Sequence, residues 1–315
     1  MNRLLMLAAT VVLLSACGGG GGGSATVSYD GITAQATVTE ENAADLAALA
    51  YYGSELSDPL PISALQVVSS DGEATSVLPQ LVDMIGALPE RITVNQLSDN
   101  ATFAAMAIPA FTEPCEISGN MTISGTFDEF TGALNATLSM ASCNSGGGVV
   151  MDGTMLLNAS GIADIGNPEF ATYSVTFKHL TYDFVADNDS IVLDGTALSW
   201  FDNVQSAQIM QINMIMQQVG TSLKAKLEDY TVSVVDVGME QQVSISGRIY
   251  ESTVGYIDLS TLQPIMVDIY GEPCQGVYRI EGAGGTWAEV DFSILTGDQG
   301  TYGDDSNNML GTFYL

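Results

Sequence analysis

Side chains suited to catalysis are few in this sequence. His179 is the only histidine among 315 residues, and it lies in a run, residues 177–182, that has the pattern of a β-strand. A Ser-His-Asp triad would have to use it, but the chain has no Gly-x-Ser-x-Gly motif to present a nucleophilic serine. A single histidine also excludes the zinc sites that need two. The sequence therefore predicts a structural or surface position for His179 and no catalytic residue.

Carboxylates are the abundant reactive groups, with 37 Asp and Glu residues against 7 Lys and Arg. The densest cluster, residues 298–308, contains Asp298, Asp304 and Asp305, whose oxygens are ligands that calcium prefers. A smaller cluster occupies residues 187–190. Neither has the spacing of a helix-loop-helix calcium site, and Asp, Asn and Gly are also the usual residues of hairpin turns. The expectation is therefore no cofactor, with Ca²⁺ as the alternative.

The acidic excess bears on partners as well. A formal net charge of −30 repels nucleic acid and anionic lipid headgroups, so nucleic-acid binding is excluded as a function. Paired carboxylates could also serve a hydrolase acting on glycosides. No pair among so many stands out, so the hydrolase remains an alternative without assigned residues.

Cys17 has the clearest chemical context of the four cysteines. Residues 1–14 are a short positive start followed by an apolar run, which is typical of a secretory signal and too short to span a bilayer, which takes about 20 residues. Leu14, Ser15, Ala16 and Cys17 resemble the bacterial lipobox, in which the cysteine becomes the lipidated first residue. That resemblance implies a signal peptide at residues 1–16 and acyl chains such as palmitate on Cys17. Gly18 stands where inner-membrane lipoproteins often carry Asp, which favours the outer membrane and leaves open which side the protein faces.

A run of glycines separates this anchor from the rest of the chain. Residues 18–23 are all Gly, a composition that does not pack into a core, so residues 17–25 are expected to be the lipidated cysteine and its tether. Residues 26–110 mix β-strand and helix patterns, with helices expected at 43–52 and 76–88. Residues 111–315 read as antiparallel β-structure, continuous with 26–110 in one domain.

Three cysteines remain in the exported part, so they cannot all pair. Cys115 and Cys143 flank a predicted hairpin, with strands at 116–127 and 132–142, and a disulfide between them is expected. The apolar residues of the two strands have opposite parity about the turn, so a β-bulge is needed to place both sets on one face. Cys274 is the cysteine left over.

Strand patterns follow one another through the C-terminal two thirds of the chain, including residues 207–218, 255–259, 265–270 and 309–314. Four segments share an apolar residue, a small or acidic residue, Gly and then a hydroxyl or long side chain; they are residues 123–126, 151–154, 193–196 and 245–248. A glycine in the middle of a strand usually marks a bulge or bend. The fold expected is mostly β: a curved antiparallel sheet, a sandwich or a half-barrel, with two short N-terminal helices.

The lipobox, the glycine run and residues 29–43 together resemble a set of Gram-negative envelope lipoproteins of unassigned function. The resemblance covers the tether and the first folded segment, and it carries no functional residue. It implies an outer-membrane lipoprotein held by its lipid, with a non-enzymatic binding or envelope-structural role. The expected partners are an apolar or polysaccharide ligand, or another envelope protein. A calcium-stabilised surface or adhesion protein and a carboxylate-dependent hydrolase are the alternatives.

Overall fold

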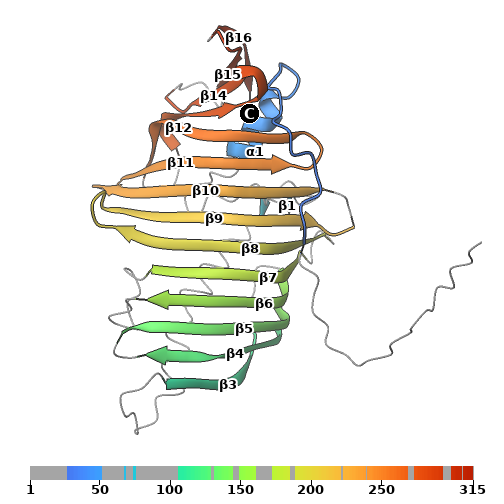
Figure 1. Ribbon diagram of the computed structural model, residues 1–315, viewed down its shortest axis with the longest axis vertical. Helices are drawn as coiled ribbons and strands as arrows, with labels where there is room; N and C mark the ends of the chain where they lie inside the picture. Colours follow the sequence, from blue (N-terminus) through green and yellow to red (C-terminus); the bar gives the residue numbers. More distant parts are fainter. Residues whose placement is uncertain are drawn as a thin grey trace, which may run out of the picture.

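The computed structural model places almost every strand in one sheet. It describes residues 27–51, 67–68, 74–75, 106–128, 131–144, 149–160, 172–184, 189–220, 223–238, 240–268, 273–293, 299–306 and 308–314. Fourteen strands form a single antiparallel sheet in which each strand pairs only with its neighbours in the sequence, from β3 to β16 (Figure 1). The sheet is open, because its end strands β3 and β16 lie at opposite edges.

The elements of the chain are short at the N-terminus and long in the large sheet. They are α1 (Ala43–Tyr51), β1 (Val67–Val68), β2 (Ala74–Thr75), β3 (Met106–Pro114), β4 (Ser118–Asp128), β5 (Ala133–Asn144), β6 (Val149–Ser160), β7 (Thr172–Phe184), β8 (Asp189–Asp202), β9 (Ala207–Gln218), β10 (Lys224–Val237), β11 (Glu240–Glu251), β12 (Gly255–Val267), β13 (Pro273–Glu281), β14 (Trp287–Asp291), β15 (Gln299–Gly303) and β16 (Met309–Tyr314). Strands β1 and β2 form a separate pair.

The prediction of a mostly β fold is confirmed, whereas several details differ. One of the two expected helices, α1, lies close to its predicted bounds, and the other, at residues 76–88, falls outside the described residues. The predicted strands at 255–259 and 265–270 are one continuous strand, β12. The predicted boundary at residue 110 falls inside β3, so the N-terminal and C-terminal segments share the sheet.

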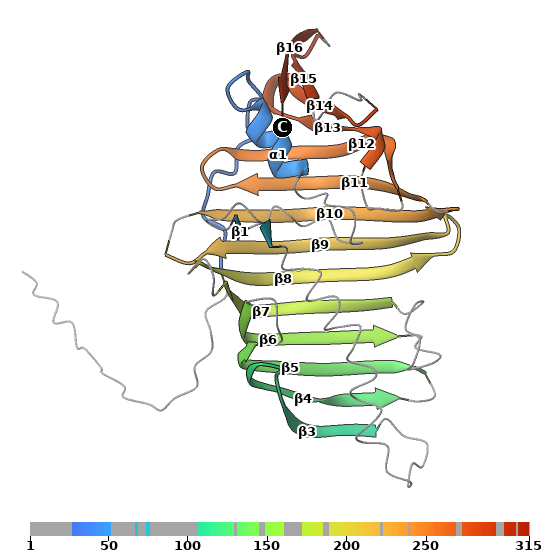
Figure 2. The same cartoon turned by 180° about the vertical axis from the view of Figure 1, so that it is seen from behind.

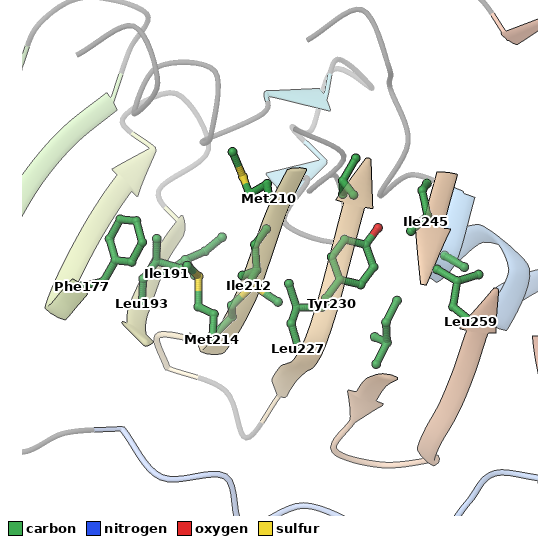
Figure 3. Packing of buried hydrophobic residues seen from close by; sticks show 14 of the residues in the cluster. Phe177, Ile191, Leu193, Met210, Ile212, Met214, Leu227, Tyr230, Ile245 and Leu259 are labelled. Carbon is green, nitrogen blue, oxygen red and sulfur yellow. The ribbon is translucent and has the colours of Figure 1, made fainter. Parts of the chain in front are cut away.

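One face of the sheet carries the hydrophobic core. Alternate residues point to opposite faces of a strand, and Met210, Ile212, Met214 and Met216 of β9 are all buried. Figure 3 shows the first three among their neighbours. These methionines are therefore part of the core. Helix α1 lies on this buried face beside the last strands (Figure 2), and the hydroxyl of Tyr278 donates to the carbonyl of Ala47 at 2.9 Å.

Bulges bend the sheet near the four glycine segments. In β7 the register against β8 shifts between Phe177 and Leu180, and in β10 the register against β9 shifts between Leu227 and Tyr230. The bulged residues are not the glycines. They include His179 of β7 and Asp229 of β10, whose φ angles are positive, 51° and 48°.

The glycine segments make room for these bulges and bind them. A Cβ on Gly153 would lie 2.5 Å from the carbonyl oxygen of His179, so no larger side chain fits there without a shift. The acidic position before the glycine has its own role: Asp194 Oδ1 accepts the His179 backbone N–H at 2.9 Å, and Asp152 Oδ1 accepts that of Ser142 at 2.8 Å. In the two segments that contain Asp, the pattern therefore supplies an acceptor for a bulged residue, and Gly153 leaves the space that the β7 bulge needs.

Candidate functional site

The face opposite the core carries an ordered set of uncharged side chains, most of them polar. Because β4 to β9 are in regular antiparallel register, residues of successive strands lie side by side in two rows that cross the sheet. One row is Ser124, Thr137, Leu156, Thr176, Thr196 and Asn213, and the other is Thr126, Asn135, Asn158, Ser174, Leu198 and Gln211. We call these two rows the polar array.

The polar array is open to solvent and contains no charged residue. Thr196, Asn135 and Asn158 are exposed, and Thr137 and Thr176 are half-buried between their neighbours. Within the part of the chain that the structure describes, no side-chain hydrogen bond occupies the hydroxyls of Thr137, Thr176 and Thr196. Adjacent strands lie about 4.8 Å apart, and same-face neighbours along a strand about 6.8 Å apart, so the hydroxyls form a regular grid.

An N-terminal strap, residues 27–38, reaches this face at the edge of the polar array. The backbone N–H of Val27 donates to Asp194 Oδ2 at 2.7 Å, and Asp194 lies two residues before Thr196 on the same face of β8. The strap then follows the strand ends towards α1 (Figure 1), where Gln35 forms a parallel bridge with Tyr256. The predicted β-pattern of this segment thus gives an extended strap with one bridge.

Most of the scarce cations lie together on the outer face of β10 to β13. We call Lys224, Lys226, Arg248 and Arg279 the cation cluster. Each pairs with a carboxylate: Lys224 with Asp30 of the strap, Lys226 with Glu228, Arg248 with Asp258 and Arg279 with Glu289.

Aromatic rings complete the cation cluster. Lys226 lies over the ring of Tyr250, and Arg248 lies 4.0 Å from the ring centre of Tyr256. Tyr29 of the strap packs edge-on against Tyr250. These cations already have carboxylate and aromatic partners within the protein, and Asp30 and Tyr29 of the strap are among the residues in these contacts. The region is therefore suited to holding the strap in place.

These contacts shift the pKa values of three side chains in or beside the cation cluster. Hydrogen bonds from Lys226 and then Tyr250 lower the pKa of the Glu228 carboxyl below its ordinary value. The Asp258 carboxylate raises the pKa of Arg248. Burial, with the nearby Glu251 carboxylate, raises the pKa of Tyr29 to about 12.

Glu228 should make the stability of the protein sensitive to acid. Its pKa is lower in the folded state than in the unfolded state, so its contribution is present above the unfolded pKa of about 4.3 and is lost as the pH falls through the folded value. We expect Glu228→Gln to reduce the loss of stability between pH 5 and pH 3, measured as the shift of the urea midpoint.

The matched control for this prediction is Glu240→Gln, which removes an exposed carboxylate from β11. It should leave the acid-induced shift of the midpoint close to that of the wild type. An identical pH dependence in the wild type and Glu228→Gln would contradict the assignment.

The predicted disulfide is present. Cys115 and Cys143 are bonded, with their Cα atoms 5.4 Å apart. The expected bulge is also found: Met121 pairs with Met140 and Ile123 with Leu138, while the register shifts nearer the disulfide. Cys274 is free and exposed, and its Sγ lies 3.4 Å from the Met266 carbonyl oxygen.

The residues of the predicted calcium cluster take up turn positions where they are described. Asp304 Oδ1 accepts the backbone N–H groups of Ser306 and Asn308, and Asp298 lies outside the described residues. Asp305 accepts a hydrogen bond from the Ser306 hydroxyl. Among the described residues, no group of three or more Asp, Glu, His or Cys side chains is placed to hold a metal ion.

Cys17 and the glycine tether lie outside the described residues. In the segments that the structure does describe, no helix has both the length and the apolar character needed to cross a membrane. Comparison with models of protein families, with curated proteins and with solved structures found no match. The geometry of the sheet is therefore the basis for assigning a function.

Proposed function

We propose that the chain is an outer-membrane lipoprotein with a non-enzymatic binding role, held by acyl chains on Cys17 and using the outer face of its sheet. The observation that carries the proposal is the position of Val27. This residue meets Asp194 on the outer face, at the edge of the polar array. The lipid anchor is thus joined to the folded part beside the face proposed to bind.

The length of chain between the two points limits their separation. Val27 lies ten positions after Cys17 in the sequence, and an extended chain covers at most about 3.5 Å per residue. The edge of the polar array is therefore kept within roughly 35 Å of the lipid anchor. Such a tether holds a binding face near the membrane without electrostatic attraction to anionic lipids. A chain with a net charge of −30 has no excess of basic residues to provide that attraction.

The outer face is preferred to the apolar face as the binding surface. Core residues such as Met155, Leu193 and Ile212 are completely buried, so a ligand could reach them only if the fold opened. The polar array is exposed as folded. This favours a polar partner over an apolar one.

The anchor is tested by replacing the cysteine. In the native host, the wild type should incorporate labelled palmitate and sediment with outer membranes, because several acyl chains give stable anchoring at roughly 0.8 kcal/mol per buried methylene. Cys17→Ser should lose both the label and the sedimentation. Cys274→Ser, the control, should keep both, and an unlabelled wild type that still sediments would contradict the proposal.

A further inference from the structure

We infer that the polar array binds a neutral polysaccharide. The inference names the ligand class for the face described above and rests on the proposed function. The polar array differs in charge from the rest of the molecule.

The contrast is one of charge. The chain has a net charge of −30, yet both rows of the polar array from β4 to β9 lack a charged side chain. Charged side chains on exposed strands discourage association between sheets. The two rows form an uncharged strip that is bounded on the same face by Lys178, Asp194 and Asp229. Such a strip carries a risk of association that a ligand would justify. An anionic polymer would be repelled by the surrounding field, which leaves a neutral one.

The chemistry of the side chains suits a polymer of sugars. Hydroxyl and amide groups both donate and accept hydrogen bonds, as sugar hydroxyls do. Thr137, Thr176 and Thr196 are β-branched and stiff at χ1, so their hydroxyls lose little freedom on binding. Leu156 and Leu198 interrupt the rows with apolar surface, and Leu198 is 37% exposed, which suits the C–H faces of sugar rings.

The geometry favours a long ligand over a compact one. Hydroxyl or amide side chains recur from strand to strand at about 4.8 Å, apart from Leu156 and Leu198, so a polymer lying across the strands meets polar groups at most strands. A protein partner fits less well, because protein interfaces are enriched in aromatic residues, Met and Arg and depleted in Ser. The two rows contain no aromatic residue and no Arg.

The test is electrophoresis of the full-length, detergent-solubilised protein in native gels that contain a neutral polysaccharide. Gels with dextran, soluble starch or galactomannan are compared with gels containing carboxymethyl-dextran, which has the dextran backbone and added negative charge. We expect retardation by at least one neutral polymer and weaker retardation by the carboxymethylated one. The triple variant Thr137→Val, Thr176→Val and Thr196→Val should raise the apparent Kd about tenfold or more, since it removes three hydroxyl partners while keeping the shape of the side chains.

The controls separate binding from folding and anchoring. Thr301→Val with Thr312→Val removes a pair of hydroxyls that face each other on β15 and β16, outside the array, and should bind as the wild type does. Thr176→Val alone serves if the triple variant has a lower urea midpoint, and should raise Kd severalfold. Retardation by no neutral polymer, or equal binding by a folded triple variant, would overturn the inference. Either result leaves the palmitate test of Cys17 unaffected.

Discussion

Replacing Cys115 and Cys143 together with alanine is expected to lower the free energy of unfolding by about 3.5 kcal/mol. The bond closes a loop with a sequence separation of 28 residues, and the chain-entropy model gives that cost for such a loop. Cys143 is buried beside the bulge of β5, so the bond also fixes the end of the hairpin next to the sheet's β3 edge. Urea unfolding at constant pH measures the change as a lower midpoint with little change in slope.

Reduction of the wild type should give a loss of similar size. Cys274→Ser is the matched control, because its thiol is free and exposed, and it should unfold at the wild-type midpoint. A midpoint of the double variant within experimental error of the wild type would show that the bond contributes no net stability.

Gly247→Ala is expected to lower the free energy of unfolding by about 3 kcal/mol. Gly247 has a φ of +136°, a conformation that residues with a Cβ rarely adopt, and an added Cβ would lie 2.5 Å from the Cα of Tyr230. The neighbour is backbone at the β10 bulge, so it cannot turn away as a side chain could. Relief would require the bulge to move, together with the buried ring of Tyr230.

Gly220→Ala separates backbone strain from collision. Gly220 also has a positive φ, +81°, but an added Cβ would meet no atom within 4 Å. Its cost should be close to the conformational penalty alone, about 1 kcal/mol. Equal losses for the two variants would show that the close approach at Gly247 does not matter. Urea midpoints of both variants check the difference.

The sequence predicted best those strands in which alternation is regular. Residues 207–218 and 309–314 were predicted with the bounds that the structure has for β9 and β16. In β9 the apolar residues alternate with Gln211 and Asn213, so the period alone indicates a strand with one buried face. The disulfide was predictable for a similar reason, because both cysteines flank one local hairpin.

Strands that depend on distant residues were harder to predict. The residues of β15, Gln299–Gly303, read as part of a turn or metal loop because two of the five are glycines. In the structure a Cβ on Gly300 would meet the ring of Phe313, and one on Gly303 would meet the ring of Trp287. Aromatic side chains from neighbouring strands therefore cover the glycines, and no local pattern reveals that cover.

The polar array was not predictable from the sequence. Thr176 and Thr196, read one strand at a time, only indicate β-propensity. They become neighbours through the register of β7 and β8, which depends on the bulge between Phe177 and Leu180. The acidic residue in the repeated glycine segments did carry a signal, because Asp194 accepts the backbone N–H of a bulged residue. Its partner could be identified only in three dimensions.

The pairing of each strand with its sequence neighbours has a consequence for the order in which the molecule can form. Synthesis delivers the N-terminus first, and local pairing lets a sheet of this kind lengthen hairpin by hairpin with small costs of loop closure. The strap is different, because Val27 meets a residue 167 positions away and Val38 meets Thr286, 248 positions away. The strap is made before the sheet, yet its contacts must wait until almost the whole of the sheet has been made.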